Sequence, residues 1–208
     1  MKTCIIMGCG PSLAALQVKR LPNHVHTFGM KNAWKYFQRL KWWPTYYANL
    51  DKKSEDYNRE SLVEIIKDPS VLTRTFFLHE KVCESDRIEV VRYRRGLFDF
   101  GASMGDLGDG GNSATNAAQI AVALGYTQIA LVGVDLNYGA ENEYFISDYH
   151  KDGEPVNEHQ VETYHNHAWV LFAKWAKKRG VLVVNCGRQS TLKCFTFQNL
   201  ASVLKKAT

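Results

Sequence analysis

Two glycine-containing loops carry the residue types that hold a phosphate group. The first, Gly8 to Ser12, reads Gly-Cys-Gly-Pro-Ser and follows a short apolar run; the second, Asp109 to Ser113, reads Asp-Gly-Gly-Asn-Ser and precedes a helical pattern. Glycine lets the backbone approach a ligand closely, and a helix N-terminus attracts an anion through its N–H groups and dipole. The predicted nucleotide contacts in these loops are Gly8, Cys9, Gly10, Pro11, Ser12, Gly111, Asn112 and Ser113.

The first loop is not diagnostic by itself. No Lys-Ser or Lys-Thr pair follows its glycines, so it is not a Walker loop, and Leu13 stands where a dinucleotide fingerprint would have its third glycine. A strand-ending structural turn is an equally good reading of the pattern. The phosphate reading gains weight because the chain contains the second loop.

Polar side chains follow three further apolar runs. Lys31 and Asn32 come after the run His24–Phe28, Asn49 and Asp51 lie at the end of Tyr46–Leu50, and Asp135 follows Ile129–Val134. Ligands of open α/β sheets bind beyond the carboxyl ends of the strands, so we expect these five side chains at the same site. No Asp-x-Asp motif supports a required metal or other cofactor, although Asp51, Asp109 and Asp135 offer ligands for magnesium through waters.

Histidines provide candidates for a general base. Four of the seven histidines fall between His150 and His167, after the run that ends at Asp135. The imidazole pKa lies near neutrality, so a histidine can take a proton from an acceptor hydroxyl. We favour His150, which precedes a flexible Lys-Asp-Gly turn, then His159, with His165 as a third candidate; a surface location is the plainer explanation for each.

The elements that position these residues alternate along the chain. Continuous apolar runs predict strands at 4–7, 24–28, 46–50, 71–78, 87–93, 129–134 and 181–184. Helical spacing predicts helices beginning at Leu13 and covering about 33–43, 52–67, 113–124, 158–178 and 195–205. The weakly patterned stretches are 96–111, expected to be a mobile loop, and 136–158, expected to be a lid. We therefore predict an α/β fold, a single Rossmann-like domain over 1–208 with a mainly parallel sheet flanked by helices.

Composition limits the function classes. The chain has 208 residues, 45% of them hydrophobic, and no apolar run approaches the length of a transmembrane helix. Five scattered cysteines without zinc spacing, and no signal peptide, indicate reduced thiols and a cytoplasmic location. The net charge of +5 suits an anionic nucleotide and is also compatible with nucleic acid. The sequence leaves open whether the protein forms a homo-oligomer.

Several segments together resemble a known family. They are Ile5–Leu13, Asn32, Asn49, Asn112–Ser113 and the run Ala123–Asp135 with its Leu-Gly-Tyr start. The set resembles glycosyltransferase family 42, the bacterial sialyltransferases that use CMP-sialic acid. It is also similar to the group around domain of unknown function 115, which includes archaeal hydroxymethylpterin diphosphokinases. The segment Val184–Leu192 is similar to that of short bacteriophage relatives, which would place the protein in a bacterial host's cytoplasm.

This resemblance implies a GT-A-like variant of the Rossmann-like fold and a CMP-type donor. Asn32, Asn49 and Ser113 would contact the nucleotide, and a tyrosine pair, Tyr138 and Tyr144, would support the leaving phosphate. A histidine of the lid would be the catalytic base. The chain departs from the family at Cys9, where the sialyltransferases have asparagine, and in a shorter lid.

Three functions follow as hypotheses. The leading one is a transferase with a nucleotide-sugar donor and an unknown acceptor, either a glycan or a modified nucleic acid. The second is diphosphate transfer from ATP, for which Asp51, Asp135 and the basic cluster Arg92–Arg95 are the features in favour. The third is a non-catalytic nucleotide- or DNA-binding protein.

Overall fold

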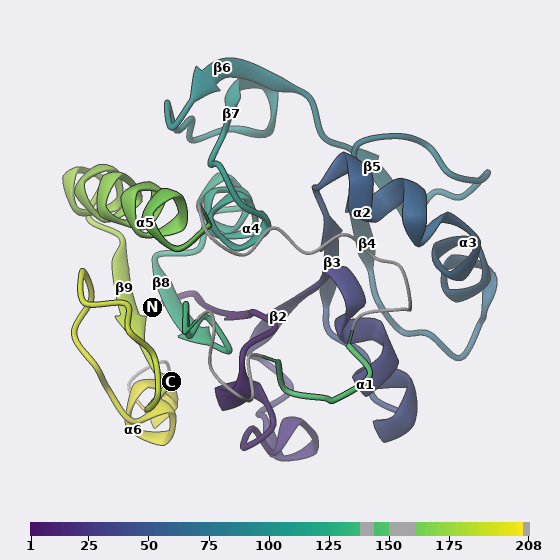
Figure 1. Ribbon diagram of the computed structural model, residues 1–208, viewed down its shortest axis with the longest axis horizontal. Coiled ribbons are helices and arrows are strands. Elements are labelled where there is room, and N and C mark those ends of the chain that lie inside the picture. The colour runs from purple at the N-terminus through teal and green to yellow at the C-terminus, as the bar shows by residue number, and fades with distance from the viewer. Residues whose placement is uncertain (138–143, 150–160, 206–208) are drawn as a thin grey trace.

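A parallel sheet of seven strands forms the centre of the described part of the chain in the computed structural model, which describes residues 1–137, 144–149 and 161–205 (Figure 1). The strand order is β5-β4-β3-β2-β1-β8-β9. The bounds are β1 Thr3–Met7, β2 His26–Met30, β3 Tyr46–Asn49, β4 Thr75–Leu78, β5 Ile88–Val90, β8 Gln128–Val132 and β9 Leu182–Asn185. The prediction of a Rossmann-like parallel sheet flanked by helices is confirmed.

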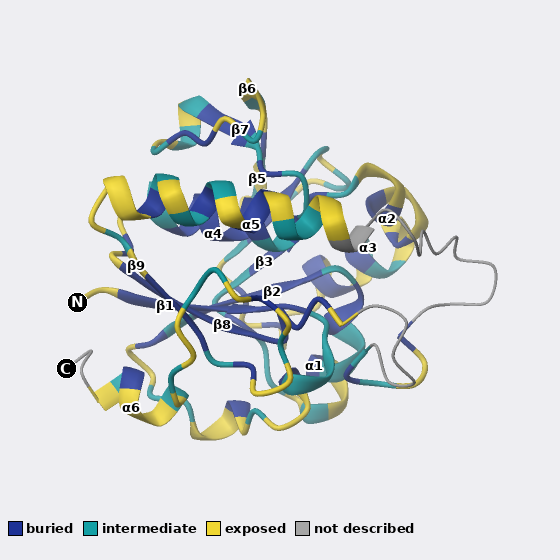
Figure 2. Cartoon of the chain, turned by 60° about the vertical axis from the view of Figure 1, so that its left-hand side comes forward, coloured by how far each residue is buried: buried dark blue, intermediate teal, exposed yellow. Residues whose placement is uncertain are grey.

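Helices cover both faces of this sheet. On one face, α4 (Ser113–Ala123) and α5 (Val161–Lys178) pack on Cys4 and Ile6 of β1. On the other face, α1 (Trp34–Leu40), α3 (Arg59–Lys67) and α6 (Leu200–Lys205) belong to the layer that packs on Ile5 and Met7. Figure 2 shows the dark, buried strands between the two helical layers. Successive side chains of a strand point to opposite faces, so the continuous apolar run of β1 serves both cores.

Helix α4 lies close to the sheet because its inner side chains are small. Ala117, Ala118 and Ala121 are fully buried in the core that it shares with β1, β2 and β3. The Asn112 side chain caps this helix by accepting hydrogen bonds from the N–H groups of Ala114 and Thr115. The helix expected after the second glycine loop is therefore confirmed, and its N-terminus is fixed at the carboxyl edge of the sheet.

The segment after the first glycine loop differs from the expectation. Two short 3-10 helices, Pro11–Leu13 and Val18–Arg20, replace the α-helix expected from Leu13. Ser12 is already bonded to Asp135 through both its backbone N–H and its hydroxyl, so tertiary contacts hold the chain in a turn at this point. The helix expected over 52–67 is divided at Asn58 into α2 (Lys52–Tyr57) and α3.

The stretch expected to be a mobile loop at 96–111 has regular structure. Strands β6 (Tyr93–Leu97) and β7 (Leu107–Asp109) form a small second sheet, which lies beyond α4 and α5 in Figure 1. Arg95 of β6 forms ion pairs with Asp99 and Asp106. Across the described residues, no helix is both long and apolar enough to cross a membrane.

Candidate nucleotide site and active site

The two central strands β1 and β8 end side by side, and their exit loops are joined by Asp135. Its carboxylate accepts hydrogen bonds from the Ser12 N–H at 2.7 Å and the Ser12 hydroxyl at 2.6 Å. The Ser12 hydroxyl in turn accepts from the Gly133 N–H at 2.8 Å. Strand order reverses between β1 and β8, because the chain runs outward from β1 to β5 and then returns to β8. Such a switch point is where open α/β sheets bind ligands.

Three glycines allow the loops to meet this closely. A Cβ atom on Gly10 would lie 2.5 Å from an Asp135 oxygen, and one on Gly187 would lie 2.6 Å from the other oxygen. A Cβ on Gly8 would lie 2.3 Å from the Gly133 carbonyl oxygen. The expectation was that Gly10 makes room for a ligand; the structure shows that it makes room for Asp135. Asp135 is only 2% exposed, so its carboxylate is shielded from solvent. Its two hydrogen bonds from Ser12 hold the first loop in shape.

The N-terminus of α4 presents buried donors at the same edge of the sheet. Within the described residues, the Asn112 amide nitrogen and the Ser113 hydroxyl are buried and have no hydrogen-bond partner. Gly111 has φ +77°, and the Phe98 ring fills the space where its Cβ would lie. The side-chain oxygen of Asn112 is used for capping, so the amide nitrogen is the part of this side chain that is left to bind a ligand. An anion bound there would also benefit from the helix dipole.

Asn49 ends strand β3 and is fully buried. Neither its amide nitrogen nor its amide oxygen has a hydrogen-bond partner among the described residues. An unmade hydrogen bond of a buried polar group costs about 1–3 kcal/mol, so such a group requires an explanation. Asn32, after β2, is also buried, and its amide donates to the Tyr149 carbonyl oxygen at 2.9 Å.

An ion pair connects the exit loops of β2 and β3. The Lys31 ammonium lies 2.9 Å from the Asp51 carboxylate, and Asp51 also caps α2 through the Ser54 N–H. Burial opposes ionisation of Asp51, but Lys31 and the backbone hydrogen bonds outweigh it and lower the Asp51 pKa. Lys31 and Asp51 therefore meet as expected for residues at one edge, and each neutralises the other.

His165 is the candidate base within the described residues. It lies in the first turns of α5, within electrostatic range of Lys31 and Asp51. Burial lowers its pKa to about 4, with Lys31 acting in the same direction and Asp51 against it. The imidazole is neutral at physiological pH, and its low pKa makes it a weaker base than an ordinary histidine. His150, His159 and Tyr138, named from the sequence, lie outside the described residues.

Part of the expected lid packs on the first glycine loop. The Phe145 N–H donates to the Cys9 carbonyl oxygen at 3.2 Å, and Phe145 and Tyr149 are buried against the core. Tyr144, proposed to support the leaving phosphate, stacks on Tyr149 with ring centroids 4.1 Å apart. Burial raises the pKa of the Cys9 thiol to about 11, so Cys9 is a neutral packing group at physiological pH.

The described residues contain no group of three or more acidic, histidine or cysteine side chains arranged to hold a metal ion. The three aspartates considered for magnesium make separate contacts. Asp51 pairs with Lys31, Asp135 with Ser12, and Asp109 accepts from the Gly111 N–H at 2.8 Å. Magnesium dependence stays a prediction to be tested in solution.

Sequence reasoning missed the contribution of the loop after β9. The Ser190 hydroxyl donates to the Val134 carbonyl oxygen at 2.8 Å, and the Thr191 N–H donates to the Asp135 carbonyl oxygen at 2.8 Å. Gly187 lies next to both partners of this link, because a Cβ atom on it would be 2.6 Å from an Asp135 carboxylate oxygen and 2.8 Å from the Ser12 hydroxyl oxygen. The available signal was the Gly-x-x-Ser-Thr sequence directly after a buried strand, which places small and hydroxyl side chains at the same edge of the sheet.

Comparison with solved structures identifies proteins of the same fold. The α-2,3-sialyltransferase Cst-I from Campylobacter jejuni matches with a TM-score of 0.60 and 20% identity, over 95% of this chain and 80% of that chain. The sialyltransferase CstII from Campylobacter jejuni, in complex with cytidine-5'-monophosphate, matches with a TM-score of 0.61 and 17% identity, over 95% of this chain and 84% of that chain.

A further match is the sialyltransferase CST-II in complex with a trisaccharide acceptor and CMP, with a TM-score of 0.59 and 19% identity over 94% and 85% of the two chains. No family model and no curated protein matches the sequence. At these identities the comparison establishes the architecture. The resemblance stated from the sequence is therefore confirmed at the level of the fold: this chain has the fold of the CMP-binding sialyltransferases.

Proposed function

We propose that this protein is a glycosyltransferase that takes a sugar from a cytidine-monophosphate donor. The observation that carries the proposal is Asn49, a fully buried amide without a partner in the described residues, at the carboxyl end of the sheet. A nucleotide held at this edge would satisfy the amide, because the base and the ribose offer both donors and acceptors. The sialyltransferase neighbours, two of them in complexes with CMP, support the choice of cytidine.

The leaving phosphate would lie at the N-terminus of α4. The Ser113 hydroxyl and the Asn112 amide are donors in a buried setting, where hydrogen bonds to developing negative charge are strongest. In the transfer, the acceptor hydroxyl oxygen forms a bond to the anomeric carbon of the donor sugar. The bond from that carbon to the phosphate oxygen breaks, its electron pair leaves with CMP, and the hydroxyl proton passes to a base.

The proposed base is a histidine near this edge. His165 is neutral and close to Lys31 and Asp51, whereas His150 and His159 remain candidates from the sequence. A bound phosphate would raise the pKa of His165 from its value of about 4, since negative charge stabilises the imidazolium. The base would thus become stronger when the donor is present.

The diphosphokinase alternative finds less support in the structure. It needs cations around a triphosphate, but Arg95 is paired with Asp99 and Asp106.

We further propose that the protein acts in the cytoplasm, which agrees with cysteines that are all free thiols in the structure.

The experiment is a titration of the protein with CMP, UMP, AMP, GMP and ATP, followed by thermal unfolding. A ligand that binds the folded state raises its stability by mass action, by about 2.7 kcal/mol at a hundredfold excess over Kd. We expect the largest increase with CMP and release of CMP from CMP-sialic acid. Stabilisation by ATP alone would contradict the proposal.

A further inference from the structure

Positive charge is concentrated in the last part of the chain. After Glu162 the sequence contains eight Lys and Arg residues and no Asp or Glu, so these 46 residues carry more than the whole net charge of +5. Their described part forms α5, β9, the loop after β9 and α6, which lie around the β9 edge of the sheet (Figure 1). One side of the molecule is therefore basic, whereas the preceding part of the chain has a net negative charge.

Helix α5 presents an outward face of aromatic and cationic side chains. Exposed residues recur along this helix every three or four positions, so they share one face. Figure 2, in which α5 comes forward, shows its exposed segments in yellow. The face is about 21 Å long, at a rise of about 1.5 Å per residue. The residues of this outward face are Tyr164, His167, Val170, Lys174, Lys177 and Lys178.

The aromatic end of the outward face adjoins the second glycine loop. The ring centroid of Phe98, directly after β6, lies 5.2 Å from that of Tyr164 and 5.3 Å from that of His167. A Cβ atom on Gly111 would lie 3.1 Å from the Tyr164 ring. Tyr164 is 40% exposed, and His167 is exposed as well. These rings are thus held by neighbours yet open to solvent, as a ring that stacks on an unpaired base must be.

The other end of the outward face is cationic. Lys174, Lys177 and Lys178 form no ion pair with any described residue. Arg179 follows them, and Asp106, a carboxylate within its electrostatic range, is already held in another ion pair. Cations in the last turn of a helix complement its dipole. The dipole does not account for the absence of acidic residues from the rest of the C-terminal segment.

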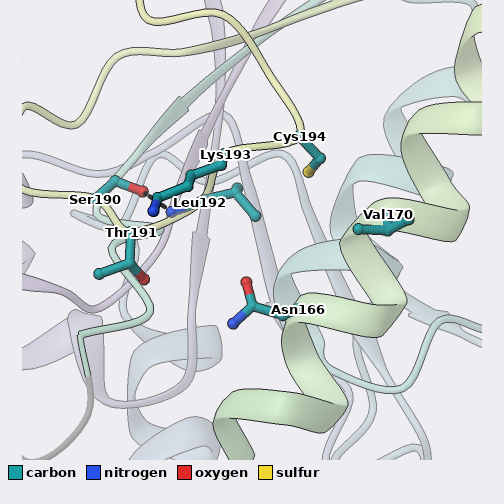
Figure 3. A pocket seen from close by; sticks show the side chains of 7 residues that line it. All are labelled: Asn166, Val170, Ser190, Thr191, Leu192, Lys193 and Cys194. Carbon is teal, nitrogen blue, oxygen red and sulfur yellow. Dashed lines mark hydrogen bonds between the residues drawn. The ribbon is translucent and has the colours of Figure 1, made fainter.

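The loop after β9 adds a cation beside α5. A groove of about 640 Å³ separates this loop from the helix, and Figure 3 shows it with Asn166 and Val170 on α5 and Lys193 on the loop. Lys193 is exposed, and no carboxylate is among the described side chains that line the groove. An anionic chain that lies along α5 would therefore meet Lys193 at its side.

The side chains of the outward face distinguish between two kinds of polyanion. A helix that binds an anionic membrane inserts large apolar side chains below its cations. Val170 is the only apolar side chain among the described residues of the outward face, and Trp169 and Phe172 are fully buried in the core. Stacking rings next to cations that follow a phosphate backbone are instead typical of sites for single-stranded nucleic acid.

We propose that the outward face of α5 binds single-stranded nucleic acid. Bases stack on Tyr164 and His167, and the phosphates lie along Lys174, Lys177 and Lys178. One end of the bound strand lies next to the second glycine loop. This binding goes beyond the proposed glycosyl transfer and does not depend on it.

The test is fluorescence anisotropy with a labelled oligothymidylate about twelve nucleotides long, in excess CMP so that the proposed donor site is occupied. We expect binding that weakens as salt is added. Lys174→Gln, Lys177→Gln and Lys178→Gln together should reduce the slope of log K against log salt by about 2, because each phosphate contact contributes about 0.7 on a single strand. Tyr164→Ala should weaken binding about fivefold or more and keep the slope, because it removes stacking and no charge.

A matched control loses the same charge on the opposite side of the sheet. It combines Lys19→Gln, Arg20→Gln and Lys67→Gln, three exposed cations on elements that pack on the other core, and it should keep the wild-type affinity and slope. Circular dichroism checks that each variant is folded.

Three results would overturn the proposal: no oligonucleotide binding by the wild type, equal effects of the two triple variants, or equally tight binding of the duplex of the same sequence. Sedimentation with vesicles of phosphatidylcholine and phosphatidylglycerol, without oligonucleotide binding, would assign the outward face to a membrane instead.

Discussion

Asn49 carries an energetic cost in the free protein that a ligand would offset. Replacing it by leucine, which has a similar volume, removes two buried polar atoms without partners in the described residues. We expect Asn49→Leu to leave the free energy of unfolding unchanged or higher, and to weaken CMP binding about tenfold, the scale of one lost hydrogen bond. Urea unfolding and CMP titration measure the two effects.

Asn58 provides the matched control for this substitution. It is almost as buried, but its amide nitrogen donates to the Ser54 carbonyl oxygen at 2.9 Å, at the junction of α2 and α3, and only its amide oxygen has no partner among the described residues. Asn58→Leu should lower the free energy of unfolding by about 1 kcal/mol and leave CMP binding unchanged. A large loss of stability in Asn49→Leu would mean that Asn49 is structural.

His165 should make stability depend on pH. Its pKa in the folded protein is about 4, below the ordinary value near 6.5, so in that interval the unfolded chain binds the extra proton. The free energy of unfolding should therefore fall as the pH decreases from about 7 to 4, and it should fall less in His165→Gln. Urea unfolding at several pH values checks this; parallel curves for both proteins would contradict it.

The sequence could predict the residues at the edge of the sheet but not their partners. Each of them stands at the end of a strand or shortly after it, and the rule that ligands bind beyond strand ends predicts that they share one edge; they are Lys31, Asn32, Asn49, Asp51 and Asp135. Which of them are engaged by other side chains depends on contacts between residues more than a hundred positions apart, such as Ser12 with Asp135. Whether these residues bind a nucleotide stays a prediction.

At the scale of elements, the N-terminus of α4 combines two roles that one substitution can separate. Asn112→Asp keeps the carbonyl oxygen that caps the helix and adds a negative charge that favours the helix dipole, worth about 0.3–1 kcal/mol. It also removes the amide donor and repels a phosphate. We expect stability equal to or above that of the wild type and much weaker CMP binding, measured by thermal unfolding with and without CMP. Tighter binding in the presence of magnesium would indicate a metal site instead.

The loops after β1 and β8 depend on one hydroxyl group. Ser12→Ala removes the donor to Asp135 and the acceptor for the Gly133 N–H, and we expect a loss of about 1–3 kcal/mol of stability. Ser202→Ala, on the exposed side of α6, should change stability little. Chemical unfolding of both variants gives the comparison; equal stabilities would show that the Ser12 hydroxyl contributes nothing, since the backbone hydrogen bond from Ser12 to Asp135 is kept in the variant.

Element types were predictable where the local pattern and the tertiary fold agree. The apolar run of β8 and the capped, alanine-rich α4 are determined locally. The segment after Gly10 has helix-forming residues, but the Asp135 carboxylate binds Ser12 and keeps the chain in 3-10 turns. The β6–β7 pair has little hydrophobic alternation, so no sequence period indicated it.

At the scale of the whole molecule, the arrangement of acidic groups predicts metal-independent activity. Asp51, Asp109 and Asp135 each have separate partners. In the function that we propose, the N-terminus of α4 would stabilise the leaving phosphate without a cation. We expect CMP release from CMP-sialic acid to continue in EDTA at nearly the untreated rate. Activity that is lost in EDTA and restored by magnesium would show that substrate phosphates bring a metal into the site.

The central position of β1 has a consequence for how the chain is made. Thr3 pairs with Gln128, 125 residues later, so one side of β1 has no strand to bond until β8 has left the ribosome. Closing so long a loop is slow, because the chain loses conformational entropy when distant residues meet, before their packing stabilises the fold. The unpaired apolar edge of Thr3–Met7 is the kind of strand on which nascent chains aggregate. We therefore expect the nascent chain to aggregate least when translation is rapid or when chaperones cover the N-terminal strand.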